Sequence, residues 1–229
     1  MYNFRNWKEY NALDFNNLVR LGGFLKQDMI DTISGDKKVL FVQTKRLSGV
    51  FDLCKVYVPT MKIENLNLKE GSFVNIEGYL RTQNYVRNNK SHLELSVRAY
   101  DIQKPEKSKM YDNNECLLIG HLAKKPIYRT TPFGREIGEG ILAVEHFHER
   151  TMNESYYIPF IVWGGNAGFL QQFDAGDKFA LEGRLQSRPY DKKMPDGSIH
   201  KKIAFEMSAH NVVYLRENNR SGKTISFTK

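Results

Sequence analysis

One short segment of the chain combines cations and an aromatic residue in a pattern suited to binding a polyanion. In LEGRLQSRPY, residues 181–190, the side chains of Arg184, Arg188 and Tyr190 have the same parity. If the segment is a β-strand, all three lie on one face, because successive side chains point to opposite faces. Guanidinium groups pair with phosphates, and a tyrosine ring can stack on a base. This face therefore offers both contacts that single-stranded nucleic acid needs, without reading the base sequence.

The first half of the chain repeats this arrangement, and a neighbouring segment adds further aromatic residues. Tyr79, Arg81 and Tyr85 share one parity in YLRTQNY, and Tyr157 shares a parity with Trp163 in YIPFIVW. A base stacked on an exposed ring contributes ~1–3 kcal/mol, which is more than a typical surface ion pair contributes. Aromatic residues are also favoured in subunit interfaces, so a purely structural assembly role stays open.

Lysines surround the turn that follows Tyr190. The segment 191–202 reads DKKMPDGSIHKK, and its Pro-Asp-Gly indicates a hairpin loop. These cations could close over a bound strand or could simply be solvated. The corresponding segment, 86–92, is shorter and carries fewer cations. The remaining candidates for nucleic-acid contact are Lys192, Lys193, Lys201, Lys202, Arg129, Tyr57, Phe147 and His148.

Composition favours the same class of partner. The formal net charge is +8 and the pI is near 9.3, as is typical of proteins that bind polyanions. Cys54 and Cys116 stand apart without CxxC spacing, which indicates buried thiols in a reducing compartment rather than a zinc site or a disulfide. No apolar run is long enough to span a membrane. We expect a cytoplasmic protein without membrane, metal or cofactor.

Residue types that could serve catalysis occur in two carboxylate pairs and one histidine pair. The carboxylates lie beside glycines in turn-like sequence, and neither pair has a basic or metal-binding partner at a useful spacing. The histidine pair lacks a third ligand. We therefore expect a binding protein rather than an enzyme; the pairs are Asp174 with Asp177, Glu136 with Glu139, and His146 with His148.

The two halves of the chain align as a divergent tandem repeat, with an offset that grows along the chain as loop insertions would make it grow. The matched positions are Gly23 with Gly120, Tyr57-Val-Pro59 with Tyr157-Ile-Pro159, Glu77-Gly78 with Glu182-Gly183, Tyr85 with Tyr190, and Ala99 with Ala209. The repeat predicts duplicated domains. Because Ile63 falls near the position of Trp163, we expect the second half to bind more strongly.

Each half reads as strands, with period-two alternation bounded by Gly, Asp and Pro. A short helix is predicted at residues 167–173, between the third and fourth strands, with a weaker counterpart at 63–68. Five strands with this helix are the layout of the OB-fold, a small Greek-key barrel. We expect an all-β chain with two five-stranded OB-fold barrels in tandem. The expected parts are an N-terminal extension (1–16), domain 1 (17–103), a linker (104–113), domain 2 (114–215) and a basic tail (216–229).

Five motifs of the second half resemble, in order and spacing, the bacterial single-stranded DNA-binding protein family. They are NNECLLIGHL (113–122), PIYRTTPFG (126–134), LAV (142–144), YIPFIVW (157–163) and LEGRLQSRPY (181–190). The resemblance is weaker over residues 17–103. It implies an OB barrel that stacks single-stranded DNA on Tyr157, Trp163 and Tyr190, with a further aromatic near Phe147 or His148. RNA as the ligand stays open, since OB barrels also accept it.

The family also sets an expectation for assembly, and the chain departs from the family at its end. Most members have one OB domain per chain and form tetramers, whereas two-domain chains dimerise, so a homodimer with four barrels is expected here. Members usually end in an acidic tail that recruits replication and repair enzymes. Residues 216–229 are instead basic, which makes recruitment by that route doubtful.

Overall fold

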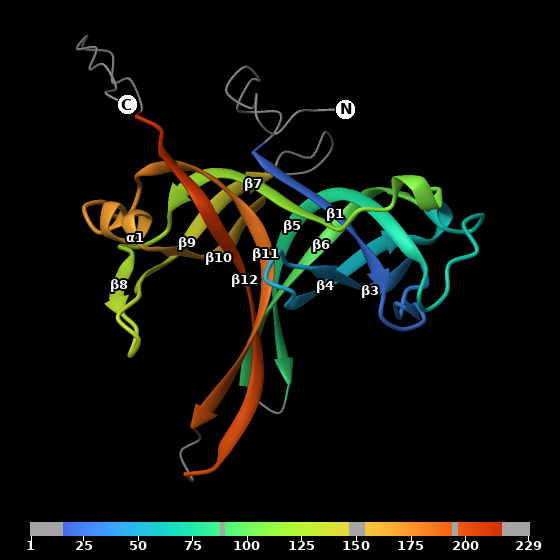
Figure 1. Cartoon of the computed structure of the whole chain (residues 1–229), viewed down its shortest axis with the longest axis horizontal. Helices are drawn as coiled ribbons and strands as arrows, with labels where there is room; N and C mark the ends of the chain where they lie inside the picture. The colour runs from blue at the N-terminus through green and yellow to red at the C-terminus, as the bar shows by residue number, and fades with distance from the viewer. Residues whose placement is uncertain (1–15, 88–89, 147–153, 194–196, 217–229) are drawn as a thin grey trace.

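The computed structural model describes residues 16–87, 90–146, 154–193 and 197–216, and these consist mainly of β-strands (Figure 1). The strands of the first half are β1 (Asn17–Leu25), β2 (Ile30–Asp31), β3 (Lys37–Lys45), β4 (Phe51–Pro59), β5 (Phe73–Arg87) and β6 (Lys90–Gln103). Those of the second half are β7 (Asn113–Leu122), β8 (Ile127–Thr130), β9 (Glu136–His146), β10 (Glu154–Trp163), β11 (Lys178–Lys193) and β12 (Ile199–Tyr214).

Both halves close into the same five-stranded barrel. In the first half the order is β3-β4-β6-β5-β1, and a pairing of β1 with β3 closes the barrel. In the second half the order is β9-β10-β12-β11-β7, closed by β7 with β9. One neighbouring pair in each barrel, β4–β6 and β10–β12, is parallel. The predicted all-β OB-fold architecture is confirmed; the short β2 and β8, which pair with β3 and β9, are additional to it.

The two barrels join through an antiparallel pairing of β1 with β7, so that twelve strands form one continuous sheet. Val19 lies opposite Cys116 at the centre of this pairing, and the strand order reads alike outward from it in both directions. The buried cores of both barrels are continuous across the junction. Figure 1 shows the long hairpins β5–β6 and β11–β12 projecting to the same side of the molecule.

A helix is present in the second half, as predicted, but α1 spans Gly165–Leu170 rather than 167–173; it buries Ala167 and Leu170. The helix predicted at residues 63–68 is wrong: these residues form turns and irregular chain, and η2, a short 3₁₀ turn (Thr60–Lys62), ends before them. Asn67 has φ 44°, in the left-handed region that an α-helix cannot include. A second 3₁₀ turn, η3 (Lys107–Lys109), lies between the barrels in sequence.

The repeated Glu-Gly pairs are β-bulges. The register of β5 against β6 shifts between Glu77 and Gly78, and that of β11 against β12 shifts between Glu182 and Gly183. A Cβ on Gly183 would lie 2.1 Å from the backbone oxygen of Ser208. Glycine is therefore required for the close approach of the two strands at each bulge.

Both long hairpins extend further than the sequence predicted. The predicted loop 191–202 is wrong at both ends, because β11 continues to Lys193 and β12 starts at Ile199. The loop predicted at 86–92 is likewise shorter, since β5 reaches Arg87 and β6 starts at Lys90. Cross-strand pairing continues into the lysine-rich arms, with Asp191 opposite Lys201, a favourable pairing of opposite charges.

Strand register also corrects one part of the repeat alignment. Leu25 on β1 lies opposite Val42, and its equivalent on β7, Leu122, lies opposite Leu142. Val42 pairs with Cys54, whereas Leu142 pairs with Ile158. Cys54 and Ile158 are thus equivalent.

The match of Tyr57 with Tyr157 is therefore wrong: Tyr57 corresponds to Ile161, and Pro59 rather than Ile63 corresponds to Trp163. The second half has four extra residues between Leu142 and Ile158, ahead of this motif. Ile63 is instead buried in the core.

Candidate nucleic-acid interface

A groove of about 490 Å³ lies beside Trp163, at the end of β10. Arg184 on β11, Arg135 just before β9 and Arg46 of the first half all line it. Its remaining wall consists of three polar side chains: Gln186, Ser208 and His210. The indole of Trp163 is 39% exposed, so an aromatic face and three cations share one surface.

Arg46 reaches this groove because an ion pair holds it. Its Nε and Nη2 donate hydrogen bonds of 2.7 and 2.6 Å to the carboxylate of Asp52, which is buried. Oδ1 of Asp52 also accepts a 2.8 Å bond from the backbone N–H of Ser187, on β11 of the other half. In return, the Ser187 hydroxyl accepts a 3.1 Å bond from the N–H of Leu53. The first half is thereby fixed against the strand that carries Arg184.

Two of the three guanidinium groups of the groove, those of Arg46 and Arg184, repel each other. The pKa of Arg184 is lowered by burial and by the charge of Arg46, while the nearby carboxylate of Asp52 acts in the opposite direction. The pKa of Arg46 is raised by its hydrogen bonds to Asp52. Among the described residues no ion pair is recorded for Arg184, so an anion entering the groove would relieve this repulsion.

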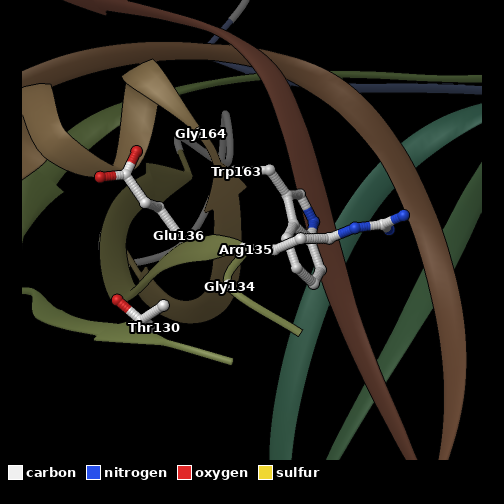
Figure 2. A pocket seen from close by; sticks show the side chains of 6 residues that line it. All are labelled: Thr130, Gly134, Arg135, Glu136, Trp163 and Gly164. Atoms are coloured by element: carbon white, nitrogen blue, oxygen red, sulfur yellow. The ribbon is translucent and has the colours of Figure 1, made fainter. Parts of the chain in front are cut away.

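A second hollow, of about 610 Å³, lies against Trp163 and shares Arg135 with the first. Thr130, Glu136 and the backbone at Gly134 and Gly164 complete its lining. Figure 2 shows the charged ends of Arg135 and Glu136 pointing to opposite sides, with the Arg135 side chain on the Trp163 side. The two hollows therefore meet at Trp163 and Arg135.

Tyr157 shares the outward face of β10 with Trp163, as the parity predicted, and 54% of its side chain is exposed. The two lie six positions apart along the strand, which corresponds to about 20 Å. Ile161, between them on the same face, is buried and offers no surface. The face of β10 thus presents one aromatic at each end.

The predicted cationic face of β11 is only partly open. Arg184 lines the groove, but Gln186 is buried and donates a 3.0 Å hydrogen bond to Glu206 of β12. Arg188 forms a 3.0 Å ion pair with the same carboxylate and is partly exposed. Phosphate contact by Arg188 would therefore compete with Glu206.

The aromatic candidates of the first half are engaged within the chain. The guanidinium of Arg98 lies 3.8 Å from the centre of the Tyr57 ring, and the Tyr57 hydroxyl donates a 2.9 Å bond to Glu94. Tyr79 is half-buried and stacks on Tyr156 of the second half, with ring centres 6.2 Å apart.

The remaining first-half candidates also have partners. Arg81 pairs at 3.5 Å with Glu154 of the second half and lies over the ring of Tyr156. Tyr85, which is exposed, stacks on His92 at 5.3 Å. The structure therefore does not gather the first-half candidates into a groove like that at Trp163.

The other predicted residues lie outside this groove or outside the described part of the chain. Arg129 is exposed on β8 and pairs with Glu139. Lys201 is exposed on the long β11–β12 arm. Phe147 and His148 lie outside the described residues, and the side chains of Tyr190, Lys192, Lys193 and Lys202 are likewise not described.

Sequence reasoning missed several groove residues, among them Arg46, Arg135 and His210. Arg135 directly follows the Thr-Pro-Phe-Gly turn, and its position in that motif was a usable signal. His210 follows Ala209 at the bulge of β12, where the register shift displaces the alternation. For Arg46 the sequence carries no local signal, since its place depends on packing against the other half.

The possible catalytic groups are occupied by structural contacts. Asp177 accepts a 2.9 Å bond from the backbone N–H of Asp174, which also pairs with Lys125. Glu136 accepts a 2.7 Å bond from the hydroxyl of Tyr128. Within the described ranges, no group of three or more His, Cys, Asp or Glu side chains is placed to hold a metal, and no helix there is long and apolar enough to cross a membrane.

Comparison with known proteins assigns the second barrel to a family. Residues 113–215, which contain β7 to β12, match the single-strand binding protein family. A single-stranded DNA-binding protein of Clostridium tetani is 33% identical over 110 residues, covering 47% of this chain and 73% of the relative. Single-stranded DNA-binding protein 3 of Clostridium acetobutylicum is 33% identical over 114 residues, covering 47% and 76%. The chain belongs to the single-strand binding protein family.

A solved structure extends the likeness in fold to both halves of this family member. The wild-type single-stranded DNA binding protein from Thermus aquaticus superposes with a TM-score of 0.68 and 22% sequence identity. The match covers 90% of this chain and 96% of that one. The sequence relationship thus centres on the second half, whereas the shared fold includes the first barrel as well.

Proposed function

We propose that this protein binds and protects single-stranded DNA with little sequence specificity, during replication, recombination or repair. Bases would stack on Trp163 and Tyr157, with Tyr190 as a third platform, while Arg184 and the lysines of the β11–β12 arm neutralise phosphates. The observation that carries the proposal is the exposed indole of Trp163 in a groove with three arginines, within a barrel of this family. Stacking and phosphate pairing need no base readout, which accounts for low specificity.

The proposal includes a non-enzymatic role, a cytoplasmic location and duplicated domains at residues 17–103 and 114–215. It also includes a homodimer, which would bring four barrels together. Sedimentation at micromolar protein should then give twice the mass of one chain. A mass of one chain, independent of protein concentration, would contradict the dimer without affecting DNA binding by a single chain.

The test is a fluorescence titration of labelled oligo-dT, of about 35 nucleotides, against the matching duplex and an oligo-U strand. Tight binding that prefers the single DNA strand and weakens steeply with salt is expected. The variant Trp163→Ala with Tyr157→Ala should lose affinity by at least about tenfold, since each stacked base contributes ~1–3 kcal/mol.

The matched control is Tyr111→Ala, which removes an aromatic residue that is also exposed but lines a different hollow, beside Arg20. Its affinity should equal that of the wild type. Equal binding to single strand and duplex would contradict the proposal. Preference for oligo-U would identify RNA as the ligand, and an unaffected double variant would indicate that these aromatics serve assembly.

A further inference from the structure

The groove beside Trp163 contains a cation that belongs to the other half of the chain. Arg46 precedes β4, whereas Trp163, Arg184 and Arg135 come from the second half. No motif of the second half predicts this contribution. A ligand in the groove would therefore touch both halves.

Arg46 has N–H donors that its ion pair with Asp52 does not use. Its Nε and Nη2 bond to Asp52, and the third nitrogen, Nη1, carries two further N–H groups. The side chain is 21% exposed, whereas that of Asp52 is 1% exposed. The buried carboxylate of Asp52 therefore fixes the position of Arg46, and part of the Arg46 side chain stays at the surface.

Arg184 has no such anchor among the described residues, yet it lines the same groove as Arg46. A structural ion pair would need only one arginine for one buried carboxylate. Two guanidiniums beside a single carboxylate leave a net positive charge, and guanidinium forks bind phosphate oxygens with good geometry. The fixed junction of Asp52 with Ser187 holds the two cations in place before a ligand arrives.

We propose that Arg46 and Arg184 clamp one phosphate of the bound strand at the junction between the two barrels. This inference rests on the proposed function and adds to it. The strand leaves the Trp163 platform toward the first half, and the first barrel contributes through Arg46 rather than through its own aromatic residues. The junction between the two barrels is thereby part of the binding site.

The experiment compares Arg184→Gln, the paired variant Arg46→Gln with Asp52→Asn, and their combination. The paired change removes the ion pair without leaving a buried carboxylate unpartnered. Affinity for oligo-dT should fall about five- to tenfold in each, and the slope of log affinity against log salt should decrease by about 0.7 per lost phosphate contact. Because both arginines hold one phosphate, the combined loss should be smaller than the product of the separate losses.

The matched control is Arg20→Gln with Glu77→Gln. Arg20 is similarly buried, at 18% exposure, and pairs with Glu77 at 3.1 Å, but lines a different hollow. This variant should keep wild-type affinity and salt slope. Arg184→Gln leaves no buried group without a partner. Its affinity and salt slope therefore test the proposal even if the paired variant does not fold.

Salt slopes unchanged in both arginine variants would overturn the clamp, and fully multiplicative losses would assign two separate phosphates and overturn it as well. A failure of the proposed function would give a different result, in the wild-type protein rather than in the variants. The wild-type chain itself would then not prefer the single strand.

Discussion

Asn17 and Asn114 make the same pair of hydrogen bonds at equivalent places in the two barrels. The amide of Asn17 donates to the carbonyl of Leu80 at 2.9 Å and accepts from its N–H at 2.8 Å. Asn114 repeats both bonds with Leu185, at 2.9 and 2.8 Å. Each amide thus completes the backbone pairing where β5 or β11 separates from its neighbouring strand. The two barrels thus share a polar contact as well as a strand order.

Replacing either asparagine by alanine should destabilise the fold by about 2–4 kcal/mol, because one backbone N–H and one C=O lose their partner. Asn114→Ala should be the more costly change, since Asn114 also donates a 3.0 Å bond to Thr44 of the first half. Urea unfolding measures both variants. Asn211→Ala, which removes an exposed amide bonded to Glu182, is the control and should change stability by less than about 0.5 kcal/mol. Losses no larger than the control's would contradict this role.

Gly183→Ala should destabilise the second barrel by about 3 kcal/mol, because the new methyl group would collide with the backbone of β12. Gly78→Ala should destabilise the first barrel similarly, because its new Cβ would lie 2.3 Å from the carbonyl oxygen of Arg98. Gly168→Ala is the control: a methyl group there meets nothing within 4 Å, and alanine favours the helix α1. Thermal unfolding should therefore separate two destabilised variants from a neutral or stabilised one. A normal melting temperature for Gly183→Ala would show that the bulge can open.

Alkaline pH should destabilise the protein through its two thiols. Burial raises the pKa of Cys54 to about 12, and that of Cys116 well above 9.0. An unfolded thiol ionises near 8.5, so above that pH the unfolded state has lost protons that the folded state retains. Stability is then full below about pH 8 and falls as pH rises.

The loss at pH 10 should be about 1–2 kcal/mol per thiol. It is measured by urea unfolding at pH 7.5 and pH 10, for the wild type and for Cys54→Ala with Cys116→Ala. The double variant should be less stable at pH 7.5 but should lose less on going to pH 10. Parallel losses in the two proteins would assign the alkaline effect to other groups, such as the buried Tyr156.

Sequence patterns correctly predicted which side chains of a strand are buried and which face outward, because this depends on local periodicity. The alternation of Ile158, Phe160 and Val162 places these three residues in the core, and by the same parity Tyr157 and Trp163 face outward. The turn residues and the Glu-Gly pairs marked the two barrels. Period-two alternation is a property of each strand alone, so it survives whatever the strand packs against.

The features of the site that the sequence did not predict depend on pairing between strands that are distant in the chain. Arg46 enters the groove only because Asp52 bonds to Ser187, in the other half of the chain. Gln186 follows the parity of Arg184 but is buried beside Glu206. Tyr57 was matched to Tyr157 because an identical motif outweighed an insertion that only the strand register reveals.

DNA affinity should depend on Trp163 and not on Tyr57. Trp163→Ala should weaken binding of oligo-dT by about 5- to 150-fold, which corresponds to one lost stacking platform of ~1–3 kcal/mol, with little change in stability because the indole is partly exposed. Tyr57→Ala should show the reverse pattern. It removes the ring under Arg98 and the bond to Glu94, so it should lower the melting temperature and leave affinity within about twofold, as neutral contacts do.

Titration and thermal unfolding of the two variants test this crossed pattern directly. Tyr57→Phe is the matched control, because it keeps the ring for Arg98 and for any stacked base but removes the hydroxyl. If Tyr57→Ala weakened DNA binding as much as Trp163→Ala while Tyr57→Phe did not, a base would have to displace Arg98 from the ring. The first barrel would then bind DNA through its own aromatic face, and the division of roles between the two halves would be refuted.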